Sequence, residues 1–83
     1  MKVTVKYFAS IREAIGVSSE SVHSAAPTLS VLRDELIAQG GAHAESLARG
    51  RAVRMALNQV MCDEATLLVE GAEVAFFPPV TGG

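Results

Sequence analysis

The fold is decided by residues 73–83, which have the sequence Glu73-Val74-Ala75-Phe76-Phe77-Pro78-Pro79-Val80-Thr81-Gly82-Gly83. The first five of these residues are rich in valine and phenylalanine, which favour β-strands. Proline lacks the amide donor that a sheet needs, so Pro78 and Pro79 end the strand and keep the chain extended. We therefore expect a strand over 73–77 and, after it, an extended tail over 78–83.

The tail has the features of a segment that enters another protein. The six residues from Pro78 to Gly83 span at most about 20 Å when extended. Gly82 and Gly83 have no side chains, so they fit a channel that is too narrow for other residues, and the carboxylate of Gly83 is open to attack. Glycine-rich termini are often frayed without a functional reason. Two prolines at the base of this tail, and two phenylalanines before them, favour the functional interpretation.

Composition predicts one small folded domain, which we place at residues 1–77. The chain has 83 residues and a net charge of −2, and 49% of its residues are hydrophobic. These values are typical of a globular protein. The basic residues are scattered, and only Arg49, Arg51 and Arg54 lie near one another. We interpret that group as a solvated loop and expect no nucleic-acid binding.

Cysteine and hydropathy predict where the protein works. Cys62 is the single cysteine, which excludes an internal disulfide and favours a reducing compartment. Residues 1–6 lack the apolar stretch of a signal peptide, and no run approaches the roughly 20 apolar residues of a membrane span. We therefore expect a cytoplasmic protein without a membrane partner. Cys62 itself is expected to be a small buried residue. His23 and His43 lack ligand spacing, so no metal site is predicted.

Apolar periodicity predicts the other elements. Strands are expected over 3–7, 19–23, 53–57 and 60–62, the last two around a turn at Asn58-Gln59. A capping box at Ser10–Glu13 predicts a short helix that ends at Gly16. Thr28 is the expected N-cap of a main helix over 29–39, which ends before Gly40-Gly41. Residues 42–48 add a short helix or an irregular turn.

The main helix is amphipathic. Leu29, Leu32 and Leu36 repeat at helical spacing, and Ile37 widens the apolar stripe. The polar run Arg33-Asp34-Glu35 is expected to face water. One such helix against one face of a mixed sheet is an α+β architecture. With the last strand leading into a free Gly-Gly tail, the order of elements matches a ubiquitin-like β-grasp fold.

Two blocks of the chain resemble the small, sulfur-carrier subunit of molybdopterin synthase. The first block is Val5-Lys6-Tyr7-Phe8-Ala9-Ser10-Ile11-Arg12-Glu13, followed by Gly16. The second and more specific block runs from Gly71 to Gly83. Asn58 also fits the family. Ala72 departs from it, because an acidic residue often follows the turn glycine, and residues 40–53 carry no family pattern.

The resemblance implies a covalent carrier that is not an enzyme on its own. An ATP-dependent, E1-like activating enzyme would adenylate Gly83, and a persulfide sulfur would displace AMP to leave a C-terminal thiocarboxylate, or 1-thioglycine. No bound cofactor is implied. Sulfur would then pass to the cyclic pyranopterin precursor in the large synthase subunit, and two small and two large subunits would form a heterotetramer. The tail would thread into the large subunit, and its threading residues would be Pro78, Pro79, Val80, Thr81 and Gly82.

Strand parity predicts a surface for the partner. If Val5 and Tyr7 face the helix, Phe8 lies on the other side of the sheet. The same alternation turns Phe77 and Met61 outward. Because the first and last strands of a β-grasp sheet are neighbours, these three side chains would form one exposed apolar patch, which is typical of interfaces. Arg12, on the exposed side of the short helix, joins this predicted interface, where it could pair with a carboxylate of the partner; the alternative, which the residue type favours, is a solvated arginine.

Two other functions fit the same tail. The chain could be a sulfur carrier of another pathway, such as thiamine biosynthesis, with the same chemistry and a different acceptor. It could also be a ubiquitin-like modifier or an interaction module, in which Gly83 joins a lysine or does not react. The run Phe76-Phe77-Pro78-Pro79 favours the molybdopterin carrier.

Overall fold

A computed structural model describes residues 1–79 as a five-stranded sheet with three helices. The predicted tail residues Val80, Thr81, Gly82 and Gly83 lie outside the described residues. None of the helices in residues 1–79 has the length and apolar character needed to cross a membrane. The elements are β1 (Lys2–Tyr7), α1 (Ala9–Ile15), β2 (Ser19–His23), α2 (Leu29–Ile37), α3 (Gly41–Leu47), β3 (Arg54–Leu57), β4 (Val60–Cys62) and β5 (Glu73–Phe77).

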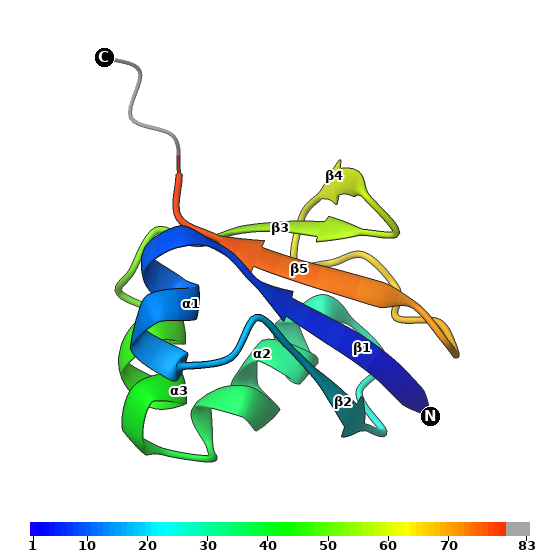
Figure 1. The fold of residues 1–83 in the computed structure, drawn as a ribbon. Coiled ribbons are helices and arrows are strands. Elements are labelled where there is room, and N and C mark those ends of the chain that lie inside the picture. The colour runs from blue at the N-terminus through cyan, green and yellow to red at the C-terminus, as the bar shows by residue number, and fades with distance from the viewer. Residues whose placement is uncertain (80–83) are drawn as a thin grey trace.

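The sheet has the strand order β2-β1-β5-β3-β4 (Figure 1). β1 and β5 run parallel in the centre, with Val5 opposite Val74 and Tyr7 opposite Phe76. The pairs β1–β2, β3–β5 and β3–β4 are antiparallel. The sheet is therefore mixed, and the prediction that the first and last strands are neighbours is confirmed.

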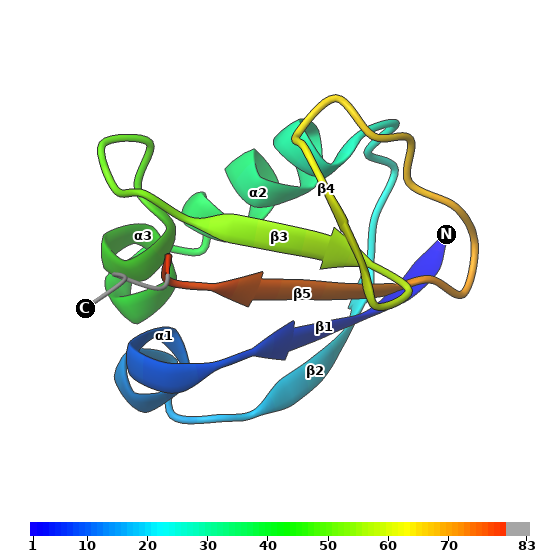
Figure 2. The same ribbon diagram turned by 90° about the horizontal axis from the view of Figure 1, so that it is seen from above.

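All three helices lie on one side of the sheet, and Figure 2 looks onto the other side. The side chains between the sheet and the helices are buried because alternate strand residues turn toward α2. Leu29, Leu32 and Leu36 are fully buried, as their spacing predicts. The largest fully buried side chains on the strands are Val3, Val5, Tyr7, Val74 and Phe76.

The start of α1 differs from the prediction. The capping box at Ser10 and Glu13 is wrong, because the helix begins at Ala9 and its N-cap is Phe8, without a side-chain cap. The backbone of Phe8 is held by the sheet: its N–H donates to the Phe76 carbonyl at 3.1 Å, and its own carbonyl accepts the N–H of Ile11 at 3.2 Å. Sheet pairing therefore fixes where the helix starts.

Other helix ends follow the local signals. Gly16 takes the left-handed conformation (φ 93°) after α1, as expected of a C-cap glycine. The Thr28 hydroxyl accepts the N–H of Val31 at 3.3 Å and caps α2. α2 ends at Ile37, two residues before the predicted end, and residues 41–47 form α3, so the short-helix alternative for this segment is confirmed.

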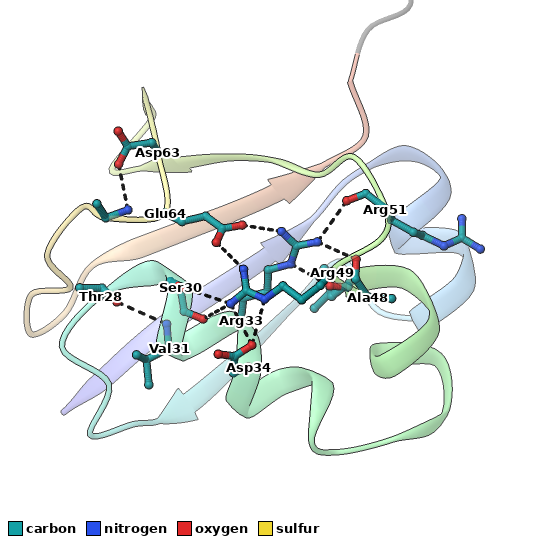
Figure 3. A network of polar contacts seen from close by, with 12 residues as sticks. Thr28, Ser30, Val31, Arg33, Asp34, Ala48, Arg49, Arg51, Asp63 and Glu64 are labelled. Atoms are coloured by element: carbon teal, nitrogen blue, oxygen red, sulfur yellow. Dashed lines mark hydrogen bonds and ion pairs between the residues drawn. The ribbon is translucent and has the colours of Figure 1, made fainter.

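The prediction that Arg33 faces water is wrong. Its side chain is buried, and it donates to the carbonyl oxygens of Leu47 (2.7 Å), Ala48 (2.8 Å) and Arg51 (3.2 Å). It also donates to Glu64 at 2.6 Å (Figure 3). Buried charge is tolerated only when it is paired and hydrogen-bonded, and this guanidinium satisfies both conditions. Arg33 thus ties the loop between α3 and β3 to α2.

Arg49 belongs to the same network, which corrects the view that the three neighbouring arginines form one solvated loop. It donates to Asp34 and to the carbonyl of Ser30, and it pairs with Glu64 (Figure 3). These contacts help hold the pKa of Glu64 below its ordinary value, because the pairing with Arg49 and Arg33 outweighs partial burial, which alone would raise it.

Candidate functional site

Two aromatic rings meet on the face of the sheet that carries no helix. The ring of Phe8 contacts the ring of Phe77 edge to face, with centroids 6.3 Å apart and an interplanar angle of 87°. Phe8 is 43% exposed and Phe77 is half-buried. Both precede a change of direction, since β1 leads into α1 at Phe8 and β5 ends at Phe77. The predicted outward parity of these residues is confirmed.

Alternation along β5 separates two adjacent phenylalanines. Phe76 is fully buried and stacks on Tyr7 with centroids 6.4 Å apart, whereas Phe77 points to the opposite face. Because the side-chain period of a strand is two residues, neighbours in sequence must face opposite sides. Phe76 therefore contributes to the core, and Phe77 is left for contacts outside the domain.

The face of the sheet that carries Phe77 continues with two buried alanines, Ala75 and Ala56, and then with the exposed Met61. Met61 is 55% exposed on the edge strand β4, and the register places it opposite Ala56. Ala56 in turn lies opposite Ala75 on β5. We call the surface formed by Phe8, Phe77, Ala75, Ala56 and Met61 the open face. The two alanines were missed by sequence reasoning, although their alternation with buried neighbours would have identified them.

Arg12 is exposed on α1, one turn after Phe8, and its N–H donates to the Phe8 carbonyl at 3.3 Å. It forms no salt bridge with another residue of the described range 1–79. Its position leaves the guanidinium available at the Phe8 end of the open face.

A hollow of about 200 Å³ lies next to the base of the predicted tail. Pro78 forms one side of it, and residues of α1, of α3 and of the loop before β3 form the rest. The lining includes the side chains of Ser10, Ile11, Ala14, Glu45, Ser46, Arg51, Ala52 and Val53. The end of β5 thus emerges between α1 and the start of β3 (Figures 1 and 2).

A second polar cluster lies on the helix side of the sheet. The Tyr7 hydroxyl donates to Glu20 at 2.6 Å, and His43 Nε2 lies 2.8 Å from the same oxygen. Burial, followed by the hydrogen bond and charge of Glu20, raises the pKa of Tyr7. Partial burial alone would raise the pKa of Glu20, but the hydrogen bonds from His43 and Tyr7 outweigh it and lower that pKa. These groups join β1, β2 and α3.

Cys62 is half-buried against the core, as expected, with its sulfur 4.0 Å from the Met55 carbonyl oxygen. Among residues 1–79, no three histidine, cysteine or acidic side chains are grouped so that they could hold a metal ion. The open face and the hollow at the base of the tail are the two candidate functional surfaces of residues 1–79.

Comparison with known proteins identifies relatives over nearly the whole chain. The model of the ThiS family matches residues 5–83. The molybdopterin synthase sulfur carrier subunit of Escherichia coli K12 is 40% identical over 98% of this chain and 99% of that protein. In a Helicobacter pylori complex of subunits 1 and 2 of molybdopterin-converting factor, a chain that is 30% identical matches with a TM-score of 0.70 over 100% of both chains.

A wider structural likeness concerns the fold alone. The SAMP1 protein of Haloferax volcanii matches with a TM-score of 0.77 over 100% of both chains, at 24% identity. Together with the mixed sheet and the helices on one face, these likenesses confirm the ubiquitin-like β-grasp fold. The chain therefore belongs to the ThiS family, and its resemblance to the sulfur-carrier subunits of molybdopterin synthase is confirmed.

Proposed function

We propose that this protein is the sulfur carrier of molybdopterin synthesis and that it works as a consumable subunit, with the acid–base groups supplied by its partners. The observation that carries this proposal is the 40% identity to a molybdopterin synthase sulfur carrier subunit over nearly the full length of both chains. The proposed site of reaction is Gly83, in the cytoplasm, where thiols such as Cys62 stay reduced.

The proposed chemistry starts from a poor electrophile. The Gly83 carboxylate repels nucleophiles, so an E1-like activating enzyme first joins it to AMP with release of pyrophosphate. The terminal sulfur of a protein persulfide then attacks the carbonyl carbon, a C–S bond forms and AMP leaves. A thiol reduces the remaining S–S bond, which frees the thiocarboxylate. Covalent intermediates of this kind divide one difficult step into easier ones.

The geometry supports delivery by docking. The open face lies at the base of the tail, so a large subunit that covers Phe8 and Phe77 would also lie where the chain continues beyond Pro79. Exposed aromatic side chains are frequent anchors at interfaces because they bury large apolar areas. Subunits 1 and 2 of the molybdopterin-converting factor of H. pylori form a complex. We propose that two carriers and two large subunits assemble here.

Mass spectrometry tests the reaction. After incubation with the activating enzyme, ATP and a persulfide donor, the intact carrier should gain the mass of one oxygen-to-sulfur exchange, located on the peptide that contains Gly83. Sulfur mapped to Cys62 would contradict the mechanism, and an adduct on a lysine of another protein would favour the modifier function.

A truncated carrier separates the tail from the fold. Deletion of Gly83, or Gly82→Ala, should abolish sulfur transfer, because the first removes the reacting carboxyl and the second widens a segment proposed to thread a narrow channel. The thermal melting temperature should stay close to that of the unchanged protein, since Gly82 and Gly83 have no side chains with which to fill a core. A large loss of stability would show that the tail is packed structure.

A further inference from the structure

Two arginines, Arg51 and Arg54, lie next to the base of the tail and are not among the residues that define the open face. Arg54 lies directly opposite Phe77 in the antiparallel β3–β5 pair, so both side chains are on the open face. Arg51 and Pro78 both line the hollow of about 200 Å³. Both guanidinium groups belong to exposed residues. The β3 side of the tail base is therefore positively charged.

The neighbouring Arg49 shows the contrast. It forms ion pairs with Asp34 and Glu64, whereas Arg51 and Arg54 form none with any residue in the range 1–79. Asp63 and Glu64 line one hollow together with Arg54, but neither reaches ion-pair distance of it, and Glu64 pairs with Arg33 and Arg49 instead. Glu45 lines the same hollow as Arg51 without reaching ion-pair distance.

The position of Arg51 is fixed although its side chain is exposed. Its carbonyl accepts a hydrogen bond from the buried Arg33, while its own guanidinium points away from that network (Figure 3). The buried arginine thus holds the backbone of a loop whose outward side chain lies next to Pro78. Such an arrangement fixes the backbone from which the charged side chain extends, which lowers the entropy lost when a partner orders this loop.

The net charge of the whole molecule has the opposite sign to the positive edge formed by Arg51 and Arg54. The chain has a net charge of −2, so an acidic protein is repelled by it on average. An acidic surface is attracted only when it approaches the edge that carries Arg51 and Arg54. Local charge of this kind mainly raises the association rate and selects orientation.

We propose that the large subunit presents acidic side chains to Arg51 and Arg54 at the rim of the pocket that receives the tail. This inference rests on the proposed function. The six residues from Pro78 to Gly83 span up to about 20 Å, so the tail base would contact the rim and not the pocket floor.

Association kinetics test the proposal. Arg51→Glu and Arg54→Glu are compared with Lys2→Glu, which makes the same charge change at the exposed start of β1, at the other end of the sheet from the tail (Figure 1). Binding to the large subunit encoded in the same genome is followed by stopped flow at low and high salt. At low salt, each arginine variant should associate with the large subunit about tenfold more slowly than the unchanged protein. At high salt, the association rates of the variants and of the unchanged protein should differ little, because salt screens the charges. Lys2→Glu should bind like the unchanged protein.

Three outcomes overturn the inference. Wild-type association rates for both arginine variants would show that the large subunit does not contact this edge. An equally slow association of Lys2→Glu would show that the effect comes from the net charge of the carrier and not from this edge. A lower melting temperature in the arginine variants would show that these two residues stabilise the domain and do not serve the partner. In each case the unchanged carrier still binds, so the proposed function stands; absence of any complex with the unchanged carrier would reject both.

Discussion

The two faces of one sheet are built for different purposes, and Phe76 and Phe77 show the difference most simply. Phe76 is fully buried against Tyr7, whereas the adjacent Phe77 lies on the open face beside the half-exposed Phe8. The alternation of a strand assigns one ring to the stability of the domain and leaves the other for a partner. The covered face can therefore tolerate little change, while the open face can vary at small cost to folding.

The largest effect is expected from the covered face. Phe76→Ala should lower the free energy of unfolding by about 3–5 kcal/mol, because it removes a large ring and leaves a cavity. Phe77→Ala should cost less, since its ring is only partly buried in the isolated domain. Urea unfolding of both variants measures the difference. Equal losses would show that the open face is part of the core.

The second-largest loss of stability is expected from the buried Arg33. Arg33→Ala should destabilise the domain by about 2–3 kcal/mol, because buried carbonyl groups of Leu47 and Ala48 lose their donor. Arg49→Ala is the matched control: its ion pairs are exposed, so about 1 kcal/mol or less is expected. Denaturant melts of the two variants decide, and similar values would contradict a structural role specific to Arg33.

On the open face the effect should appear in binding. Phe77→Ala and Phe8→Ala should each weaken binding to the large subunit about tenfold or more, which corresponds to about 1.4 kcal/mol. The rings are proposed to bury apolar area only in the complex. Calorimetric titration measures the affinity, with Val31→Ala, on the exposed side of α2, as the control. Unchanged affinity in both phenylalanine variants would place the interface elsewhere.

The smallest effect is expected at the Tyr7–Glu20–His43 cluster. Tyr7→Phe removes one hydrogen bond and should cost about 1 kcal/mol near neutral pH. Because the pKa of folded Tyr7 is raised, its contribution is complete below its ordinary pKa of 10.0 and is lost as the pH rises above that value. Because the pKa of folded Glu20 is lowered, its contribution is lost as the pH falls through that lowered pKa.

The variant should change both ends of this pH dependence. Stability measured by thermal melting should fall less steeply above pH 10 in Tyr7→Phe than in the unchanged protein, since the titrating hydroxyl is absent. The loss of stability at acid pH should be smaller in the variant, because Glu20 keeps only the contact with His43 and its folded pKa is lowered less. Parallel pH profiles for the two proteins would contradict the assigned couplings.

Much of the fold could be predicted from local patterns. Alternation gave the faces of β1 and β5, Gly16 and Thr28 marked helix ends, and the order of elements predicted the mixed sheet. The start of α1 could not be predicted from its capping motif, because pairing of Phe8 with β5, distant in sequence, fixes the backbone there. Tertiary pairing outweighed a local signal.

The burial of Arg33 could have been predicted from its helical spacing, although the polar run Arg33-Asp34-Glu35 suggested an exposed face. Arg33 is four residues after Leu29 and three before Leu36, so it shares the buried side of α2 with both. Its partners are the carbonyl groups of a distant loop, and no sequence pattern in residues 40–53 predicted them. At the candidate site, parity identified Phe8, Met61 and Phe77. Arg54 acquired meaning only from the register of β3 with β5, and Arg51 only from the hollow that it lines with Pro78.

The division of the sheet into a covered face and a docking face is tested most directly by nuclear magnetic resonance of the isotope-labelled carrier during titration with the large subunit. The account predicts that chemical shifts change at the open-face residues Phe8, Ala56, Met61, Ala75 and Phe77. The exposed side of α2, represented by Val31 and Asp34, should keep its shifts. Changes concentrated on α2, with the open face unaltered, would contradict the account.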